Sequence, residues 1–318
     1  MERQLLIGLQ APSYEHPFDR SALASLKGTP GLELVIRKFN EYGFERFLRI
    51  QYTGSHLRIT RDNFPEIRDM LREAATILNL HHLPDLYVMG GGSINAFTAG
   101  VERPILVLHA GCIDHLSADE LFFVIGHELG HIKSGHVLYH QMGAVLPLVG
   151  DFVSRLTLGT GGLVSTALEA ALHNWQRMSE LTADRAGLLA CQNRDAAISA
   201  MVKIAGLPHK FYGRFNADDF IAQAREFKAF DENLMDKIAK FISILGHSHP
   251  WTVLRAAEFD NWMSSGEYNR ILDACGSRVA DSENAPRFCS ECGAQLMGDE
   301  TFCPQCGSKV PPQAFTTF

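Results

Sequence analysis

Two histidines separated by three residues constrain this chain more than any other feature. The run His127-Glu128-Leu129-Gly130-His131 is an HExxH motif. On an α-helix, residues i and i+4 lie one turn apart on the same face, so two imidazoles at this spacing can bind one Zn²⁺. The glutamate between them points toward the same cleft, where it can take a proton from a water molecule at the metal. The motif therefore predicts a helix that carries a zinc site and a general base, Glu128.

The residues before the motif favour this helix. Ser117, with Glu120 three residues later, has the pattern of a capping box, and the apolar residues that follow supply a buried face. We expect the helix to continue to about Val137. Gly126 and Gly130 lie inside it, although each glycine costs a helix about 1 kcal/mol relative to alanine. Their presence predicts close approach by a neighbouring helix or a substrate. The alternative is an ordinary amphipathic helix with two surface histidines.

The composition is that of a globular protein. The chain has 318 residues, of which 46% are hydrophobic and 20% are charged, so it can bury a core in one large domain and carry a second, small one. Its 29 lysines and arginines are outnumbered by 36 aspartates and glutamates, for a net charge of −7, which argues against a nucleic-acid partner. The N-terminal residues lack the charged-then-apolar pattern of a signal peptide.

One segment, Met142–Leu172, is mildly apolar, but it is interrupted by Pro147, Asp151, Arg155 and Glu169. It has no run of about 18 uninterrupted apolar residues, so we predict no transmembrane helix. Contact between this segment and a membrane surface stays an open alternative. We therefore expect a cytoplasmic protein, with membrane association as the alternative.

Apolar spacing predicts the order of helices and strands along the chain. The expected elements are a helix over Leu32–Phe44, a hairpin over Arg46–Ile59 that turns near Gly54-Ser55, a helix over Phe64–Leu80, and strands at Asp85–Met89, Ile94–Thr98 and Arg103–His109. From Ser117 onward nearly all of the chain has helical patterns. Strands followed by helices indicate an α+β domain that is mainly α, rather than alternating β-α-β units.

Four of the seven cysteines lie near the C-terminus in two Cys-x-x-Cys pairs, Cys289 with Cys292 and Cys303 with Cys306. Four thiolates at this spacing can close a tetrahedral structural Zn²⁺ site, which stabilises a segment too short to bury a core. The pattern predicts a zinc ribbon. A redox role is disfavoured because no β-α-β pattern surrounds the pairs, and we favour protein docking over nucleic-acid binding.

The other three cysteines, Cys112, Cys191 and Cys275, lie singly along the chain. Together with a thiolate metal site, unpaired thiols fit a reducing compartment better than a disulfide framework does. We expect each of the three to be a buried side chain.

A catalytic zinc needs a third protein ligand and an open position for water. His136 lies about 180° around the helix from His127, so we expect it to be an ordinary helix-end residue. Glu180 and Asp184 lie one turn apart on a later predicted helix, where Glu180 can bind the metal while Asp184 orients a ligand histidine. A solvated acidic face is the alternative for this pair, and His173 is the rival ligand.

These motifs, in this order, resemble the HtpX-like and CAAX-prenyl-endopeptidase group of zinc metallopeptidases. The resemblance rests on HELGH, on Glu180 with Asp184-Arg185, on Ser248-His249-Pro250 with Arg255, and on Asn95-Ala96-Phe97 followed by Gly100, which is similar to the group's strand before the active helix. The group implies a zincin-like, gluzincin-type domain with a small sheet and an active-site helix.

The resemblance also implies roles for individual side chains. His127, His131 and Glu180 would bind zinc, Glu128 would be the general base, Asp184 would support the ligands, and His249 and Arg255 would lie near the oxyanion of the transition state. We therefore divide the chain into a zinc metallopeptidase domain (residues 1–280), a linker (281–286) and a zinc ribbon (287–318).

The predicted function is hydrolysis of peptide bonds by a zinc endopeptidase that acts on proteins or peptides and holds one catalytic and one structural zinc ion. We expect the substrate to add as a strand beside Ile94–Thr98, in contact with Asn95 and Ala96, because an extended peptide exposes its scissile carbonyl. The ribbon is a candidate docking site for a protein partner. The alternative function is a catalytically idle, chaperone-like or partner-binding protein that uses the cleft and the ribbon.

Overall fold

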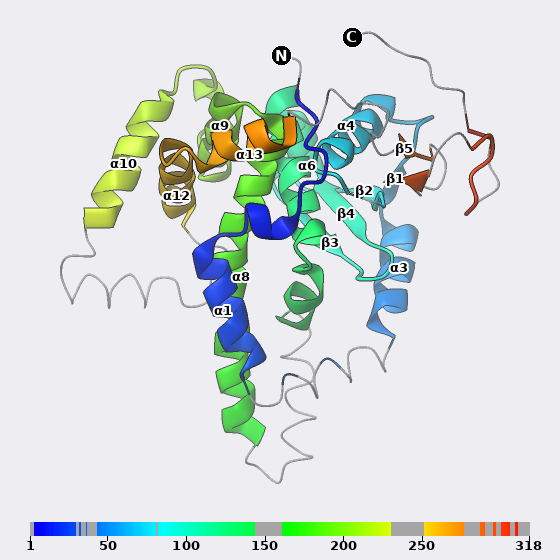
Figure 1. The fold of residues 1–318 in the computed structure, drawn as a ribbon, viewed down its shortest axis with the longest axis horizontal. Coiled ribbons are helices and arrows are strands. Elements are labelled where there is room, and N and C mark those ends of the chain that lie inside the picture. The colour runs from blue at the N-terminus through cyan, green and yellow to red at the C-terminus, as the bar shows by residue number, and fades with distance from the viewer. Residues whose placement is uncertain are drawn as a thin grey trace.

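The computed structural model is an α+β fold that is mainly helical, as the sequence predicted. It describes residues 3–29, 32, 36, 43–80, 82–143, 161–229, 251–276, 287–289, 295–296, 300–305 and 309–310. Figure 1 shows a small sheet with long helices packed around it. The predicted linker (residues 281–286) and most of the predicted helix over Leu32–Phe44 lie outside the described residues.

Four strands form the sheet, in the order β1-β2-β4-β3. They are β1 (Leu57–Ile59), β2 (Asp85–Met89), β3 (Ala96–Ala99) and β4 (Ile105–His109). β2 and β4 are parallel, whereas β1 and β3 each pair antiparallel with their neighbour. The predicted strands after residue 84 are therefore confirmed. Among the described strands, only β4 pairs with β3, so β3 is an edge strand.

The predicted hairpin over Arg46–Ile59 is wrong in its first half. Phe44–Ser55 form a helix, α3, and only the second half contains a strand. Leu48 and Tyr52, one helical turn apart, pack against the sheet. The apolar spacing is therefore helical, and the predicted turn at Gly54 is the end of a helix.

Helix α4 (Pro65–Ile77) confirms the helix that was predicted over Phe64–Leu80. Further helices are α1 (Pro17–Lys27), α5 (Ala110–His115), α9 (Arg194–Ile204), α10 (Ala217–Ala229), α12 (Thr252–Ser264) and α13 (Glu267–Gly276). Within the described parts of the chain, no helix has both the length and the hydrophobicity that a membrane span requires.

Helix α6 (Ala118–Lys133) carries the HExxH motif. Its capping box is confirmed: Ser117 Oγ accepts a hydrogen bond from the backbone N–H of Glu120 at 3.4 Å, and Glu120 Oε2 accepts one from the backbone N–H of Ser117 at 2.6 Å. The helix ends before the predicted end at Val137. Gly135 follows it with a φ of +71°, a left-handed conformation that suits glycine and stops the helix.

Helix α8 (Gly161–Cys191) packs very closely against α6. A β-carbon added at Gly126 would lie 2.5 Å from the β-carbon of Ala190, and one added at Gly130 would lie 2.5 Å from that of Ala186. Both separations are shorter than real carbon contacts, so only glycine lets the two backbones approach this closely. The close approach that these glycines predicted is therefore that of a neighbouring helix.

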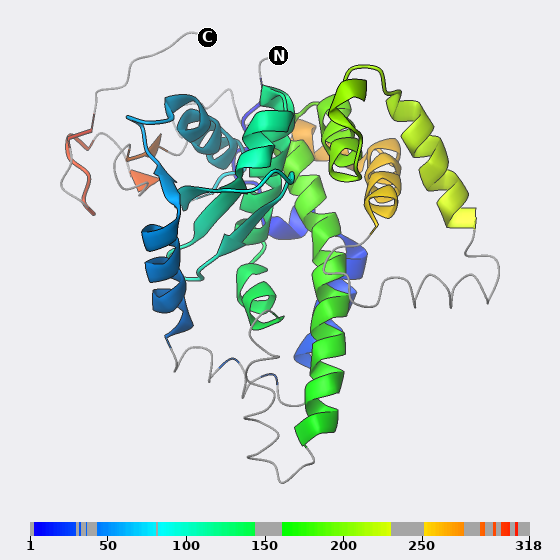
Figure 2. The same cartoon turned by 180° about the vertical axis from the view of Figure 1, so that it is seen from behind.

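The sheet separates two hydrophobic layers. Along β4, Leu106 and Leu108 face the main core with α6 and α8, while Ile105 and Val107 face α3, because successive side chains of a strand point to opposite faces. Figures 1 and 2 show α3 on one side of the sheet and α8 on the other. Helix α6 also lies against β3, so the HExxH motif is beside the open edge of the sheet.

The C-terminal region is described in part. Two short strands, β5 (Arg287–Phe288) and β6 (Gln295–Leu296), pair antiparallel. Cys289 and Cys303, one from each predicted pair, are buried in one small apolar cluster. Cys292 and Cys306 lie outside the described residues.

Candidate metal centre and active site

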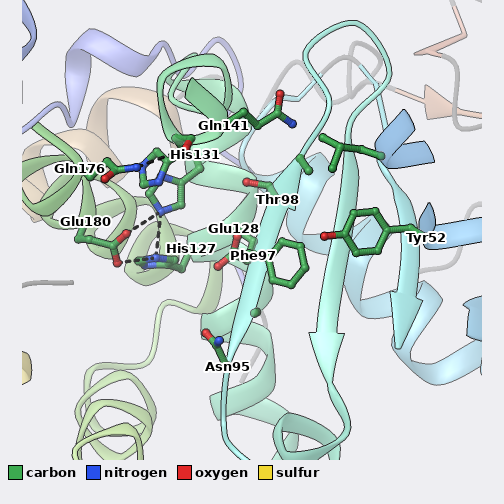
Figure 3. Close-up of a pocket in the computed structure, with 14 residues that line it drawn as sticks. Tyr52, Asn95, Phe97, Thr98, His127, Glu128, His131, Gln141, Gln176 and Glu180 are labelled. Carbon is green, nitrogen blue, oxygen red and sulfur yellow. Dashed lines mark hydrogen bonds and ion pairs between the residues drawn. The ribbon is translucent and has the colours of Figure 1, made fainter. Parts of the chain in front are cut away.

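Three side chains meet at one point between α6 and α8. The Nε2 atoms of His127 and His131 lie 3.2 Å apart. Glu180 faces both from α8: its Oε2 lies 3.4 Å from His127 Nε2, and its Oε1 lies 3.4 Å from His131 Nε2. All three side chains are buried, and Figure 3 shows them converging on one side of a cavity.

The spacing of these atoms fits a zinc ion. Zinc binds imidazole nitrogen at about 2.0–2.1 Å in a tetrahedral arrangement, so neighbouring ligand atoms should lie about 3.3 Å apart. The three separations of 3.2, 3.4 and 3.4 Å match this value. Two imidazoles and one carboxylate form a set of three donors that leaves a fourth position open. This is the arrangement of a catalytic rather than a structural zinc site.

His127 is oriented by a carboxylate. Its Nδ1 lies 3.0 Å from Asp184 Oδ1. Arg255 on α12 donates to Asp184 from Nε at 2.8 Å and from Nη2 at 2.6 Å, and its Nη1 lies 3.4 Å from Glu180 Oε2. The guanidinium therefore lies against two buried carboxylates, and Arg255 is not among the described residues that line the cavity. Its predicted contact with an oxyanion stays a prediction.

Burial and charge together set the protonation of these groups. Burial opposes the charge of Asp184, but Arg255 and His127 outweigh it and hold the pKa of Asp184 below its usual value. Burial also acts to lower the pKa of His127, but hydrogen bonds with Asp184 and Glu180 outweigh it and raise this pKa to about 10. The carboxylates that favour a proton on His127 also favour a metal cation there. Burial lowers the pKa of His131 to about 4, so this imidazole is neutral, the form that binds metal.

A second carboxylate reaches His131 through another histidine. His131 Nδ1 lies 3.1 Å from His136 Nδ1, and His136 Nε2 lies 3.1 Å from Asp19 Oδ2. Asp19 also accepts hydrogen bonds from Trp175 Nε1 at 2.9 Å and from Thr182 Oγ1 at 2.6 Å. When the ionised Asp19 accepts from Nε2–H of His136, Nδ1 of that ring can accept from the Nδ1–H of the neutral His131. The Nε2 of His131 then carries no proton and can bind a metal.

His136 is thus not the ordinary helix-end residue that its spacing predicted. It is 2% exposed and lies behind the metal site, because the chain turns back at Gly135 after α6. Asp19 was not predicted at all. It comes from α1, and nothing in its own sequence neighbourhood indicates a link to a motif so far along the chain.

A cavity of about 290 Å³ opens in front of the three candidate ligands. The edge strand β3 forms one wall, and the opposite wall carries the ligands and Glu128, which is 5% exposed. Figure 3 shows Glu128 between the ligands and β3. Five further side chains complete the lining: Leu48 and Tyr52 from α3, and His140, Gln141 and Gln176 from the side of α6 and α8. The cavity therefore joins the metal site, a buried carboxylate and an open strand edge.

The remaining predicted site residues are placed as follows. Asn95 and Ala96, the predicted substrate contacts, line the cavity. His173, the rival ligand, lies outside the cluster of candidate ligands, with its Nδ1 2.9 Å from Gln176 Oε1. His249 lies outside the described residues.

Comparison with known families agrees with this geometry. Residues 61–263, more than half of the chain, match the model of peptidase family M48. The chain belongs to peptidase family M48. The match to M48 spans the HExxH helix, Glu180 and Arg255, and a second model, a zinc-ribbon domain, matches residues 288–310.

Three M48-type relatives show the range of similarity. The chain is 32% identical over 273 residues to the plastoglobule-localized metallopeptidase 48, chloroplastic, of Arabidopsis thaliana, which covers 83% of this chain and 76% of the relative. It is 23% identical over 212 residues to protease HtpX homolog 2 of Methanosarcina acetivorans, and this match covers 58% of this chain and 71% of the relative. It is 31% identical over 88 residues to protease HtpX of Xanthomonas campestris pv. campestris, and this match covers 27% of this chain and 30% of the relative. No solved structure matches the chain significantly.

These findings confirm the predicted family, fold class and enzyme class. This M48 protein is a zinc metallopeptidase, a hydrolase whose substrates are peptides or proteins. The cluster of His127, His131 and Glu180 fits its zinc site. The alternative of a catalytically idle, partner-binding protein is not favoured.

We expect Asp19→Asn to weaken zinc binding about 10- to 100-fold, the usual effect of losing a hydrogen-bond partner behind a metal ligand. A neutral amide accepts more weakly than a carboxylate and no longer fixes which nitrogen of His136 carries the proton. The measurement is competition with a chromophoric chelator, on protein whose folding is verified by circular dichroism. Asp69→Asn is the matched control, because Asp69 pairs with Arg72 on the exposed face of α4. Equal affinities in both variants would contradict the role of Asp19.

Proposed function

We propose that this M48 peptidase hydrolyses internal peptide bonds of extended polypeptides, with His127, His131 and Glu180 as zinc ligands and Glu128 as general base. The observation that carries the proposal is the triangle of His127 Nε2, His131 Nε2 and the Glu180 carboxylate, with separations of 3.2, 3.4 and 3.4 Å, in the wall of a cavity that Glu128 also lines. A protein that only binds partners has no physical need for a buried carboxylate beside such a triangle.

Zinc, when bound, supplies a Lewis acid that polarises the scissile carbonyl and makes a water molecule more acidic. Glu128 takes the proton of the attacking water at a carboxylate oxygen and passes it to the nitrogen of the leaving amine. It stands between the candidate ligands and β3. The scissile bond of a peptide bound along β3 would lie beside it. The buried position of Glu128 keeps bulk water from competing for the proton.

Asp184 and Arg255 act as positioning residues in this proposal. Asp184 holds Nδ1 of His127, so that Nε2 faces the metal. Arg255 balances the negative charge of Asp184 and Glu180, which are both buried and would otherwise be driven toward their protonated forms. His249 keeps the role near the oxyanion that the family resemblance implies.

The edge strand β3 is the proposed docking strand for substrate. The backbone N–H of His109 donates to the carbonyl of Asn95 at 2.9 Å, so these residues form a hydrogen-bonded pair of the antiparallel ladder. Such pairs alternate along a ladder, so Ala96 and Thr98 turn their backbone N–H and C=O groups away from β4. An extended peptide in the cavity can pair with these groups as an added strand.

The second zinc is proposed to bind Cys289, Cys292, Cys303 and Cys306. The spacing of the two Cys-x-x-Cys pairs, the match to a zinc-ribbon domain and the burial of Cys289 and Cys303 in one cluster support this site. The proposed domains are the peptidase (residues 1–280), the linker (281–286) and the ribbon (287–318). We assign the ribbon a docking role toward a protein partner.

The proposed location is the cytoplasm. Cys112 and Cys191 are buried thiols that form no disulfide bond, and zinc thiolates persist where the environment is reducing. Burial raises the pKa of both thiols to about 12, which keeps them unreactive. Association with a membrane is the alternative.

Glu128→Gln should keep its zinc and lose hydrolysis by about 10²–10⁴-fold in kcat, the usual contribution of a general base. The amide preserves the shape of the side chain and leaves all three ligands in place. Cleavage of unfolded casein is compared after zinc content is verified by elemental analysis. Glu66→Gln, on the exposed face of α4, is the matched control and should cleave like the wild type. Wild-type turnover in zinc-loaded Glu128→Gln protein would refute the mechanism.

Ala96→Pro should lower kcat/KM for an unstructured peptide about tenfold, because it removes a backbone donor on the open edge of β3. The fold should survive, since this N–H does not pair with β4. Ala118→Pro is the matched control: Ala118 is exposed at the first position of α6, where proline is tolerated. Thermal unfolding is measured beside activity for both variants. Strand addition at this position is wrong if Ala96→Pro keeps both stability and activity.

We expect the two zinc ions to be removable independently of each other. Changing Cys303 and Cys306 to Ser should lower the zinc content from two ions per chain to one and leave hydrolysis of a short peptide largely intact, because the two ligand sets do not overlap. His131→Ala should remove the other ion together with the activity. Elemental analysis of purified proteins distinguishes the cases. One zinc in the wild type, or loss of both ions from either change, would contradict independent sites.

A further inference from the structure

Gln141 is a buried amide that the peptidase chemistry described above does not use. It lies in a short helical segment, residues 137–143, that follows α6. Its side chain is 7% exposed, and neither Nε2 nor Oε1 has a hydrogen-bond partner among the described residues. The same side chain lines the cavity in front of the metal site. Buried amide atoms are paired in nearly all folded proteins, so an unpaired pair in a cavity wall indicates a missing ligand.

The surroundings hold Gln141 in this position. Met142, the next residue, is completely buried against α8 and α1, and a β-carbon at Gly143 would lie 2.4 Å from Gln176 Nε2. The segment is therefore packed tightly on α8. Gln176, the neighbouring amide of the cavity wall, is satisfied by His173 Nδ1 at 2.9 Å and by the carbonyl of His140 at 3.3 Å. The amide of Gln176 is therefore paired within the protein, whereas Gln141 has an unpaired donor and acceptor on a side chain that lines the cavity.

An extended peptide needs hydrogen-bond partners on both of its edges. A strand added to β3 pairs every second residue with β3, and the intervening residues point their N–H and C=O groups to the opposite edge. Inside the cavity those groups lose water and require other partners. A glutamine side chain offers N–H donors and a carbonyl acceptor, the complement of one such residue.

We propose that Gln141 is a substrate-binding residue whose side-chain amide pairs with the main chain of the peptide on the edge away from β3. This inference rests on the proposed function, since it takes the occupant of the cavity to be an extended polypeptide. Figure 3 shows Gln141 at the end of the cleft where Thr98 lies, with Asn95 at the other end. Gln141 would therefore contact one substrate residue, which lies on one side of the scissile bond.

The proposal has a consequence for specificity. A contact with the main chain accepts any side chain, but it rejects a residue that lacks an N–H or cannot extend. Selection then acts on the conformation of the substrate, and the enzyme favours unfolded segments over folded ones. It also excludes proline or an N-methylated residue at the one position that faces Gln141.

The first experiment separates binding from folding with one isosteric change. Gln141→Met removes two unsatisfied polar atoms and keeps the volume, so its melting temperature should equal or exceed that of the wild type, while kcat/KM for an internally quenched casein-derived peptide falls about tenfold. Gln176→Met is the matched control, and it should lower the melting temperature because its amide is paired. A lower melting temperature for Gln141→Met with unchanged kcat/KM would overturn the proposal.

The second experiment tests the main-chain contact. The same peptide is made as a series, each member carrying one N-methyl group at a different position. With the wild type, cleavage should fall at the positions that face β3 and at one position that faces Gln141. With Gln141→Met only that last penalty should disappear, and with Gln176→Met it should remain. An identical pattern of penalties in the wild type and Gln141→Met would refute the contact.

A binding measurement distinguishes failure of this inference from failure of the proposed function. Fluorescence anisotropy follows a labelled peptide on zinc-loaded Glu128→Gln protein, with and without Gln141→Met. Binding that weakens about tenfold supports the role of Gln141 even if the wild type proves unable to cleave, in which case only the proposed function fails. Cleavage that depends on Glu128, together with equal binding with and without Gln141→Met, means that only the role of Gln141 fails.

Discussion

The close packing of α6 on α8 is the constraint on which the rest of the site depends. Gly126 and Gly130 on α6 face Ala190 and Ala186 on α8 with no room for another carbon atom. This approach brings a carboxylate of α8 within 3.4 Å of both motif histidines. A larger side chain at either glycine would push the helices apart, and a shift of 1 Å would separate ligand atoms that a zinc ion must bind at about 2 Å. The two glycines lower the intrinsic stability of α6, but they allow the close approach that places the three candidate zinc ligands together.

Around this contact, buried charges join four helices that lie far apart in the sequence. Asp184 on α8 connects His127 to Arg255 on α12, and Asp19 on α1 connects to His131 through a third histidine. Removing carboxylates and a guanidinium from water is unfavourable, so such a network contributes little net stability. Its value is geometric. Each candidate ligand histidine has one nitrogen engaged by a partner, which leaves the other nitrogen free to bind a metal.

The proposals for the cavity in front of this centre both concern the main chain of a substrate rather than a particular side chain. β3 has backbone groups on its open edge, and Gln141, which also lines the cavity, has an unpaired amide. In the proposed complex both would pair with peptide groups, which every polypeptide carries. Such a cleft would select an extended substrate, because folded chains have already used the same groups in their own secondary structure.

Local patterns in the sequence were sufficient for the zinc motif, the capping box of α6, the helix α4 and the strands after residue 84. Each depends on residues that are neighbours in the chain, so spacing and propensity contain the necessary information. The same reasoning placed Glu180 and Asp184 on one face of a helix and predicted the zinc ribbon that the zinc-ribbon domain model matches. It failed for α3, where a glycine near the end of a helix resembles a hairpin turn.

Only the tertiary structure decided which distant residues complete the site. Asp19 and Arg255 reach the centre because helices pack across one core, and no local pattern indicates that α1 or α12 approaches α6. His136 was misjudged for the same reason: its angle around an ideal helix points away from the metal, but the left-handed Gly135 ends the helix and turns the chain back. The sequence by itself thus determined the chemistry of the motif. Packing determined its partners, because the free energy of a contact between distant residues depends on where the whole chain places them.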